Sequence, residues 1–251
     1  MGSFQPEYFG NLGSFRPEFT TSNPLLARRK SLLALLLLIP APSLGVACAS
    51  IWFPGTLLGT CAFAISKVWL LALPLLWHLW VDKEPVQKPT VTKDGLLLGF
   101  GLGLLLSIFI YGAYIFLGDQ LLDTSMMINK VKVMGLDSPI LYFAGAVYWI
   151  LINSVLEEYV WRWFVVKQSE SLLSKWGAIL LSALAFTIHH VVIVSLYFDW
   201  PAVILCSCGV FVGGTIWSAL YSRYRSIWPG YLSHAIVDAC IFFIGAQILF
   251  S

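Results

Sequence analysis

Carboxylates and imidazoles lie within apolar stretches in the C-terminal half of this 251-residue chain. They are Glu157 and Glu158, His190, and the pair His234 and Asp238. An ionisable group inside an apolar helix costs several kcal/mol unless it is paired or hydrated, so such groups are typical of functional sites. Brought together, a carboxylate and two histidines could activate water, either directly or through a bound zinc ion.

The spacing of these residues predicts different tasks for them. Arg162 follows Glu158 by four residues, so the two share a helix face and can form an ion pair. Glu157 is turned by about 100° from Glu158 and has no such partner on its own helix. It is therefore the candidate for a carboxylate that accepts a proton from water. His234 and Asp238 are also four residues apart, so this carboxylate could orient the imidazole.

Each motif also has a purely structural interpretation. Because Trp161 and Trp163 follow the two glutamates, the group could be a charge belt at the membrane surface. His189 and His190 point in different directions on a helix, so at most one of them is expected to line a shared cavity. The chain lacks the HExxH pattern of common zinc peptidases. Three stretches that each bring polar groups inward nevertheless favour one buried site.

The composition indicates that lipid surrounds these stretches. Hydrophobic residues make up 59% and charged residues 11% of the chain, against roughly 25% charged residues in soluble domains. A net charge of +2 gives no reason to expect a nucleic-acid partner. We expect an all-α, polytopic transmembrane bundle of about seven spans, because the apolar runs are continuous and long enough to cross a bilayer. The predicted spans are 31–52, 57–80, 95–117, 139–166, 176–197, 201–222 and 228–250.

The distribution of basic residues predicts the orientation. With the N-terminus inside, the inner segments hold 12 of the 15 Lys and Arg residues and the outer loops hold two, as the positive-inside rule requires. Pro40 and Pro42 predict a kink or break in the first span. That span is expected to be an uncleaved anchor, although Ala47-Cys48-Ala49 resembles a signal-peptide cleavage site.

Three regions are predicted along the chain. Residues 1–30 contain a short imperfect repeat rich in proline and are expected to form a flexible cytoplasmic tail. Residues 31–138 form three spans without a recognised motif, and 139–251 form the core that holds the polar groups. The glycines of Gly99-x-Gly101-x-Gly103 lie in an apolar stretch with no preceding strand, so they predict close helix packing and no nucleotide loop.

Three short motifs follow one another in the core: Glu-Glu-x-x-x-Arg (Glu157, Glu158, Arg162), Phe-x-x-x-His (Phe186, His190) and His-x-x-x-Asp (His234, Asp238). Their order and their placement in late transmembrane helices resemble the CPBP family. This family comprises the type 2 CAAX prenyl proteases and bacteriocin-processing enzymes, also called the Abi family. The resemblance covers residues from about 140 to 250.

The resemblance implies intramembrane hydrolysis of a peptide bond. Glu157 would be the general base that activates water, helped by His190. His234 and its partner four residues later would stabilise the oxyanion, while Glu158 and Arg162 would form a supporting ion pair. His189 lies outside the motif and is assigned to packing.

One departure concerns the last motif, which in this family commonly ends in Asn where this chain has Asp238. An ionised Asp cannot donate a hydrogen bond, so Asp238 would either be protonated or act by orienting His234. The interpretation without a metal is preferred, but Glu157, His190 and His234 could together hold a zinc ion, so metal dependence stays open.

Two other functions are compatible with the sequence. A non-catalytic immunity or scaffold protein could keep the fold, and a transporter could use the buried groups as a proton relay. The expected partners are membrane lipids and a membrane-anchored, prenylated or leader-bearing peptide substrate. The short loops and small size favour a bacterial inner membrane.

Overall fold

The computed structural model describes residues 24–85, 90–133 and 137–250, and every regular element in these ranges is a helix. Seven helical spans are long and apolar enough to cross a membrane. The chain is therefore an all-α, multi-pass integral membrane protein, as the sequence predicts. The spans are Pro24–Trp52, Leu57–Asp82, Lys93–Leu121, Pro139–Glu170, Lys175–Val194, Trp200–Tyr224 and Trp228–Phe250.

The first span begins seven residues earlier than predicted. Helix α1 starts at Pro24, so residues 24–30 are helical, whereas the sequence prediction assigned them to the tail. The N-terminal repeat lies outside the described residues. The predicted break at Pro40 is confirmed, since α1 ends at Leu38 and α2 starts at Pro40. Proline lacks the N–H that would continue the helical hydrogen bonds.

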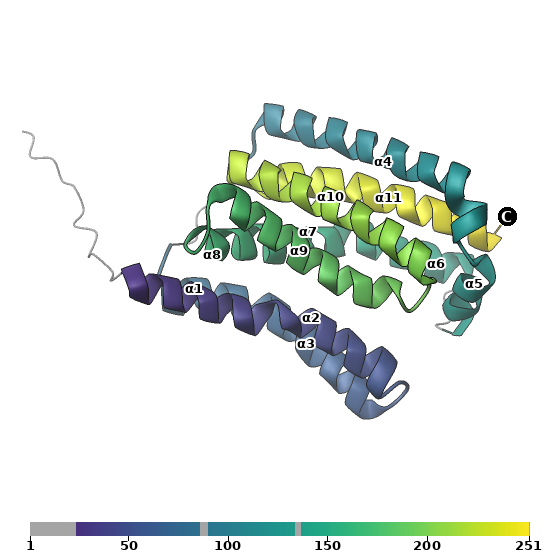
Figure 1. Ribbon diagram of the computed structural model, residues 1–251, viewed down its shortest axis with the longest axis horizontal. Helices are drawn as coiled ribbons and strands as arrows, with labels where there is room; N and C mark the ends of the chain where they lie inside the picture. Colours follow the sequence, from purple (N-terminus) through teal and green to yellow (C-terminus); the bar gives the residue numbers. More distant parts are fainter. Residues whose placement is uncertain (1–23, 86–89, 134–136, 251) are drawn as a thin grey trace, which may run out of the picture.

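The first two spans form an antiparallel hairpin at one side of the bundle (Figure 1). The buried residues Ala34, Leu35 and Leu38 of α1 belong to the same apolar core as residues of the later spans. The elements of the hairpin are α1 (Pro24–Leu38), α2 (Pro40–Ala47), the π-helical turn η1 (Cys48–Trp52), α3 (Leu57–Leu76) and the π-helical turn η2 (Trp77–Asp82).

Helix α4 (Lys93–Leu121) packs along α11 (Trp228–Phe250) at the opposite side of the bundle, as Figure 1 shows. A Cβ at Gly99 would collide with the backbone of Pro229, whereas a Cβ at Gly101 would meet open space. The packing motif is therefore Gly95-x-x-x-Gly99-x-x-x-Gly103, which leaves one glycine of the predicted set outside the contact. Glycines four apart let two backbones approach closely within a membrane.

The fourth span is one continuous helix with two π-helical stretches. Its elements are α6 (Pro139–Tyr148), η3 (Trp149–Asn153), α7 (Ser154–Glu157), η4 (Glu158–Val166) and α8 (Lys167–Glu170). π-Helical turns are rare and often lie at functional sites, because they change the direction in which side chains point. Here the junction of α7 and η4 falls between the two adjacent glutamates.

Helices α9 (Lys175–Val194) and α10 (Trp200–Tyr224) pack against each other between the hairpin and the α4–α11 pair (Figure 1). Gly214 lies against Phe186 and Ala183 of α9, and its lack of a side chain lets the two helices pack closely. A short helix, α5 (Thr124–Val133), follows α4. Helices from both halves of the chain, α3, α9 and α10, thus pack against η4 in the second half of the fourth span.

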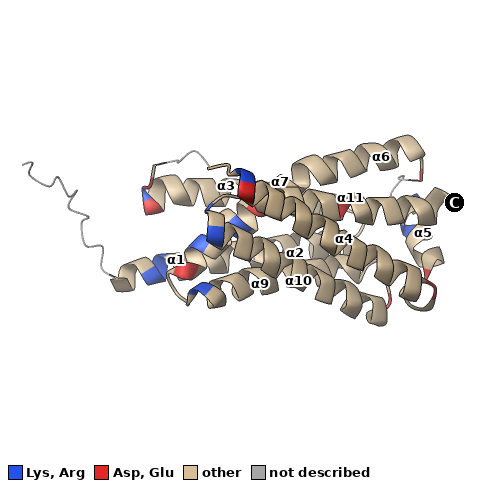
Figure 2. Ribbon diagram, turned by 90° about the horizontal axis from the view of Figure 1, so that it is seen from above, with Lys and Arg blue, Asp and Glu red and all other residues tan. Residues whose placement is uncertain are grey.

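Most Lys and Arg residues gather at one end of the bundle, near the starts of α1 and α9, as Figure 2 shows. Lys130 and Lys132 lie on α5 at the other end. This separation of the basic residues agrees with the Lys and Arg count from which the sequence predicts an N-terminus on the inner side of the membrane.

Candidate active site

His234, near the start of α11, lies among three carboxylates. Its Nδ1 atom is 3.1 Å from Oε1 of Glu158. Its Nε2 atom is 3.6 Å from Oε2 of Glu157 and 3.8 Å from Oδ1 of Asp238. Trp217 of α10 stacks on the imidazole with ring centroids 3.9 Å apart and an interplanar angle of 15°. The ring is therefore held on its face and on both nitrogen edges.

Glu158 makes the shortest of these contacts to His234. The sequence prediction gave the task of orienting the imidazole to Asp238, the residue four positions along the same helix. In the structure, the carboxylate oxygen nearest to a ring nitrogen belongs to Glu158, on another span. Carboxylate oxygen Oε2 of Glu158 lies against Gly230, where a Cβ would collide with it. A glycine at the start of α11 thus allows the carboxylate to reach the ring.

The predicted ion pair between Glu158 and Arg162 is confirmed. Nε of Arg162 is 3.4 Å from Oε1 of Glu158, and both side chains are fully buried. The guanidinium also lies over the rings of Phe186, at 4.5 Å, and Trp217, at 5.2 Å. Aromatic faces attract such a cation. The pair is thus deep in the core, which rules out a charge belt at the membrane surface for these two residues.

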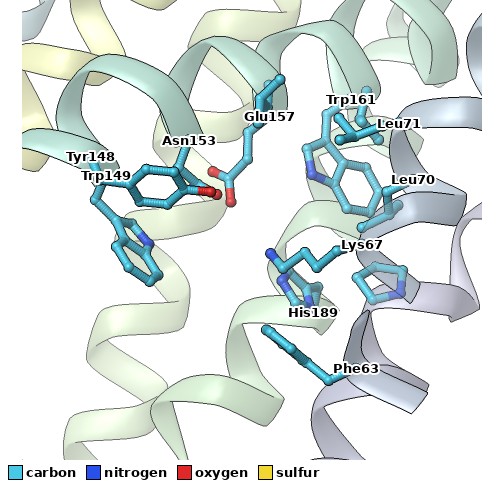
Figure 3. Close-up of a pocket in the computed structure, with 13 residues that line it drawn as sticks. Phe63, Lys67, Leu70, Leu71, Tyr148, Trp149, Asn153, Glu157, Trp161 and His189 are labelled. Atoms are coloured by element: carbon cyan, nitrogen blue, oxygen red, sulfur yellow. The ribbon is translucent and has the colours of Figure 1, made fainter. Parts of the chain in front are cut away.

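Glu157 points away from this ion pair into a cavity of about 210 Å³ (Figure 3). Its side chain is 17% exposed and accepts a hydrogen bond from the side chain of Asn153, one turn earlier. Helices α2, α3 and α9 supply other parts of the wall, including Pro42 and Phe63. Of the two adjacent glutamates, Glu157 is therefore the one that a substrate could reach.

Asp238 has a second anchor on the fourth span. The hydroxyl of Ser154 donates to Oδ2 of Asp238 over 2.7 Å and also lies near the carbonyl oxygens of Trp149 and Ile150. This contact links α11 to the point where the π-helical turn η3 ends. Asp238 consequently presents its other oxygen to Nε2 of His234.

His190 lies beside this group without a direct contact to Glu157. Its Nδ1 atom is 2.9 Å from the carbonyl oxygen of Phe186. A carbonyl oxygen can only accept, so Nδ1 carries the hydrogen, and Nε2 of the neutral ring keeps its lone pair. Glu157, His234 and Asp238 act electrostatically on the ring, and the ring of His189 lies 5.4 Å from it, measured between centroids.

His189 has a different position from the one predicted. It is buried, as a packing residue would be, but its ring also lines the cavity that holds Glu157. Lys67 of α3 lines the same cavity (Figure 3). The only sequence signal for Lys67 is a lysine inside an apolar span. In the sequence, only the polarity of Asn153 and Ser154 and their closeness to Glu157 indicate a place in the site. No motif includes Trp217.

The predicted metal set does not fit an ion as it is arranged. Among the described residues, no three His, Cys, Asp or Glu side chains converge with the geometry of a metal site. Nδ1 of His190 is bound to the Phe186 carbonyl and Nδ1 of His234 faces Glu158, so only the Nε2 atoms of these rings could bind an ion. We therefore derive no chemical step through a metal.

Residues 139–240 match the family described as Type II CAAX prenyl endopeptidase Rce1-like. This segment is a CAAX protease domain. It runs from the start of α6 to Cys240 in α11 and contains every residue of the site except the cavity wall supplied by α2 and α3. No curated protein and no solved structure matches the chain.

Proposed function

We propose that this CAAX protease domain is an endopeptidase that cleaves a peptide bond through a water molecule activated by Glu157. The observation that supports this most strongly is the different surroundings of the two glutamates. Glu158 is fully buried and paired with Arg162, whereas the carboxylate of Glu157 faces a cavity with a histidine nitrogen 3.6 Å away. Only Glu157 is available to take a proton from a water molecule in the cavity.

The proposed reaction needs one proton relay. Glu157 takes a proton from water as the oxygen attacks the carbonyl carbon of the scissile bond, which gives a tetrahedral intermediate with a negative oxygen. The protonated carboxyl group then gives the proton to the leaving nitrogen as the carbon–nitrogen bond breaks. The products are a new carboxylic acid and an amine, the proton of the new acid passes to the amine to give a carboxylate and an ammonium group, and Glu157 is returned to its starting state.

His234 is the proposed donor to the negative oxygen. Its Nε2 edge faces Glu157, and its ring is fixed by Glu158 and by the stacked Trp217. A donor that is already oriented stabilises developing charge without reorganising during the reaction. A Nδ1–H that donates to Glu158 and a Nε2–H directed at the oxyanion are both present in the imidazolium form, which Asp238 and Glu158 would stabilise.

His190 has an assisting role in this proposal. With its hydrogen on Nδ1, it presents a lone pair on Nε2 that can accept a hydrogen bond from the attacking water. Asp238 is a positioning residue that acts through the His234 ring. No step requires a metal ion, although metal dependence is a matter for direct measurement.

The proposed substrate is the lipid-modified C-terminal tail of a membrane-associated protein or peptide. The name of the matching family describes enzymes that act on CAAX prenyl motifs, which carry the lipid on a cysteine near the C-terminus. The apolar wall of the cavity, which includes Leu70, Leu71 and Trp161, suits such a substrate. A leader-bearing peptide and a bacterial inner membrane remain predictions from the sequence.

The experiment compares cells that carry the wild-type protein, Glu157→Gln or Glu84→Gln. Glu84 is a matched control because its carboxylate pairs with Lys167 outside the cavity and its side chain is 51% exposed. The N- and C-termini of membrane proteins and peptides are mapped by mass spectrometry in the three strains. We expect uncleaved substrates to accumulate with Glu157→Gln alone, at equal amounts of inserted protein.

The opposite result would favour a scaffold or immunity function. If Glu157→Gln supports the full biological function and leaves the same termini as the wild type, the endopeptidase proposal is wrong. Recovery of the termini also identifies the substrate and the cleaved bond.

A further inference from the structure

Lys67 is a basic residue in the middle of a membrane span. It lies ten residues after Leu57 and fifteen before Asp82 in the second span, so roughly 15 Å or more of helix separates it from either end. Within the described part of the chain, no carboxylate lies at ion-pair distance from its ammonium group. The ammonium nitrogen lies over the ring of Phe63, 5.5 Å from the ring centroid. An unpaired charge at this depth is costly and indicates a function.

His189 adds a second polar group to the same part of the cavity. The residue is 4% exposed, and its Nδ1 atom is buried without a hydrogen-bond partner. Nearly all buried polar atoms have a partner, so this one is an exception that needs an explanation. In Figure 3, the Lys67 ammonium lies next to the His189 ring, and the Glu157 carboxylate points into the same cavity from the opposite wall.

These two residues together suit an anion. Lysine offers three N–H donors and a positive charge, and a neutral imidazole can offer one more donor. Hydrogen bonds from a charged donor to a carboxylate are stronger than those between neutral groups. Lipid headgroups lie at the ends of a hydrocarbon core about 30 Å thick, too far from Lys67 to supply this anion. It must therefore arrive with the molecule that enters the cavity.

We propose that Lys67 and His189 form a subsite for the C-terminal carboxylate of the peptide substrate. This inference rests on the proposed endopeptidase function and specifies which end of the substrate enters the cavity. The cavity of about 210 Å³ is smaller than the roughly 300–1,000 Å³ of sites that enclose a drug-sized ligand, so it holds the end of a chain more readily than a segment that continues in both directions. The chain end is also the position at which every unmodified peptide carries a carboxylate.

The arrangement gives the peptide a direction. With its carboxylate at Lys67 and His189, the residues before it extend across the cavity towards Glu157. Lys67 belongs to α3, which lies outside the segment that matches the CAAX protease family. The N-terminal hairpin thus supplies substrate selection to a reaction centre formed by the later spans.

The test uses full-length protein in lipid nanodiscs and three synthetic probes. The first is an N-acetylated peptide with an S-farnesyl cysteine, two aliphatic residues and a C-terminal methionine with a free carboxylate. The second is the same peptide with a C-terminal amide, and the third is an amide in which glutamate replaces the methionine. Cleavage gives KM and kcat for each probe, and binding to Glu157→Gln protein gives Kd without turnover.

We expect the wild type to favour the free acid over the amide by about 10- to 100-fold in KM or Kd, the range of one or two charge-assisted hydrogen bonds. Lys67→Met removes this preference by weakening binding of the acid more than binding of the amide. Lys67→Arg retains most of it, and His189→Phe reduces it in part. Lys132→Met, on α5 at the other end of the bundle, is the matched control and keeps the full preference.

Three outcomes overturn the inference. The first is equal KM and Kd values of the wild type for the acid and the amide. The second is a preference for the acid that survives in Lys67→Met, and the third is that neither probe binds to the protein. If the glutamate amide is bound as well as the free acid, the site takes a side-chain carboxylate and the assignment to the chain end is wrong. Cleavage by Glu157→Gln would instead contradict the proposed function, so the two failures are distinguishable.

Discussion

Replacement of Glu158 by glutamine tests how the buried ion pair with Arg162 and the position of the His234 imidazole depend on one carboxylate. Glu158 is fully buried and has two partners: Arg162, which is also fully buried, at 3.4 Å, and His234 at 3.1 Å. Glutamine keeps the size of the side chain but loses its charge. Arg162 then becomes a buried cation without a counter-ion, and His234 loses the anion at its Nδ1 edge.

The expected loss of stability follows from the ion pair. Removing one partner of a buried pair costs about 3–5 kcal/mol, since the other charge remains uncompensated. At roughly 2–4 °C per kcal/mol for a chain of this size, Tm should fall by about 6–20 °C. The rate should fall by roughly 10- to 150-fold, because a hydrogen bond to a charged group contributes about 1.5–3 kcal/mol.

A double variant separates these two effects. Glu158→Gln combined with Arg162→Met removes both charges, and apolar replacement of a whole buried pair often restores stability. We expect Tm, measured by scanning fluorimetry in detergent, to recover most of its loss while the cleavage rate stays low. An unchanged Tm in the single variant would refute the buried ion pair. Recovery of the rate in the double variant would refute the role of Glu158 in positioning His234.

Three further predictions concern single groups. Gly230→Ala should displace the Glu158 carboxylate and lower both Tm and the cleavage rate, whereas Gly101→Ala, which meets open space, should change neither; equal effects would contradict this packing. Asp238→Asn should keep the rate within about tenfold, because an amide can still accept from Ser154 and one neutral hydrogen bond is worth about 1 kcal/mol; a complete loss would show that the charge itself is essential. Dialysis against a chelator should leave the rate unchanged, and a loss restored by zinc would require a metal-dependent mechanism.

The seven spans and the pairing of residues within one helix could be predicted because they depend on local sequence. A continuous apolar run is sufficient to identify a membrane span, and residues four apart on a helix share a face in any fold. The ion pair of Glu158 and Arg162 follows from that rule alone.

The contacts between spans could not be predicted in this way. The approach of Glu158 to His234 requires a glycine on α11, a π-helical turn at the glutamates and a particular crossing of two helices. Spacing within one helix indicated Asp238 in place of Glu158 for this task. The sequence shows Lys67 only as a lysine in an apolar span, since its place in the cavity depends on how the N-terminal hairpin packs.

The depth of the site also required the structure. By residue count, His190 lies deeper than His234, so either α9 had to begin later than predicted or the site had to lie well within the membrane. Helix α9 begins at Lys175, one residue before its predicted start. The first explanation is therefore wrong, because His190 lies fifteen residues after the start of α9 and four before its end at Val194.

The central claim is that Glu157 activates the water that cleaves the substrate. The most direct measurement is the single-turnover rate of peptide cleavage by purified wild-type and Glu157→Gln proteins in nanodiscs, with Glu84→Gln as the control. General-base catalysis contributes about 10²- to 10⁴-fold, so the rate should fall by at least that factor with Tm and insertion unchanged. A Glu157→Gln protein that cleaves within tenfold of the wild-type rate would contradict the account.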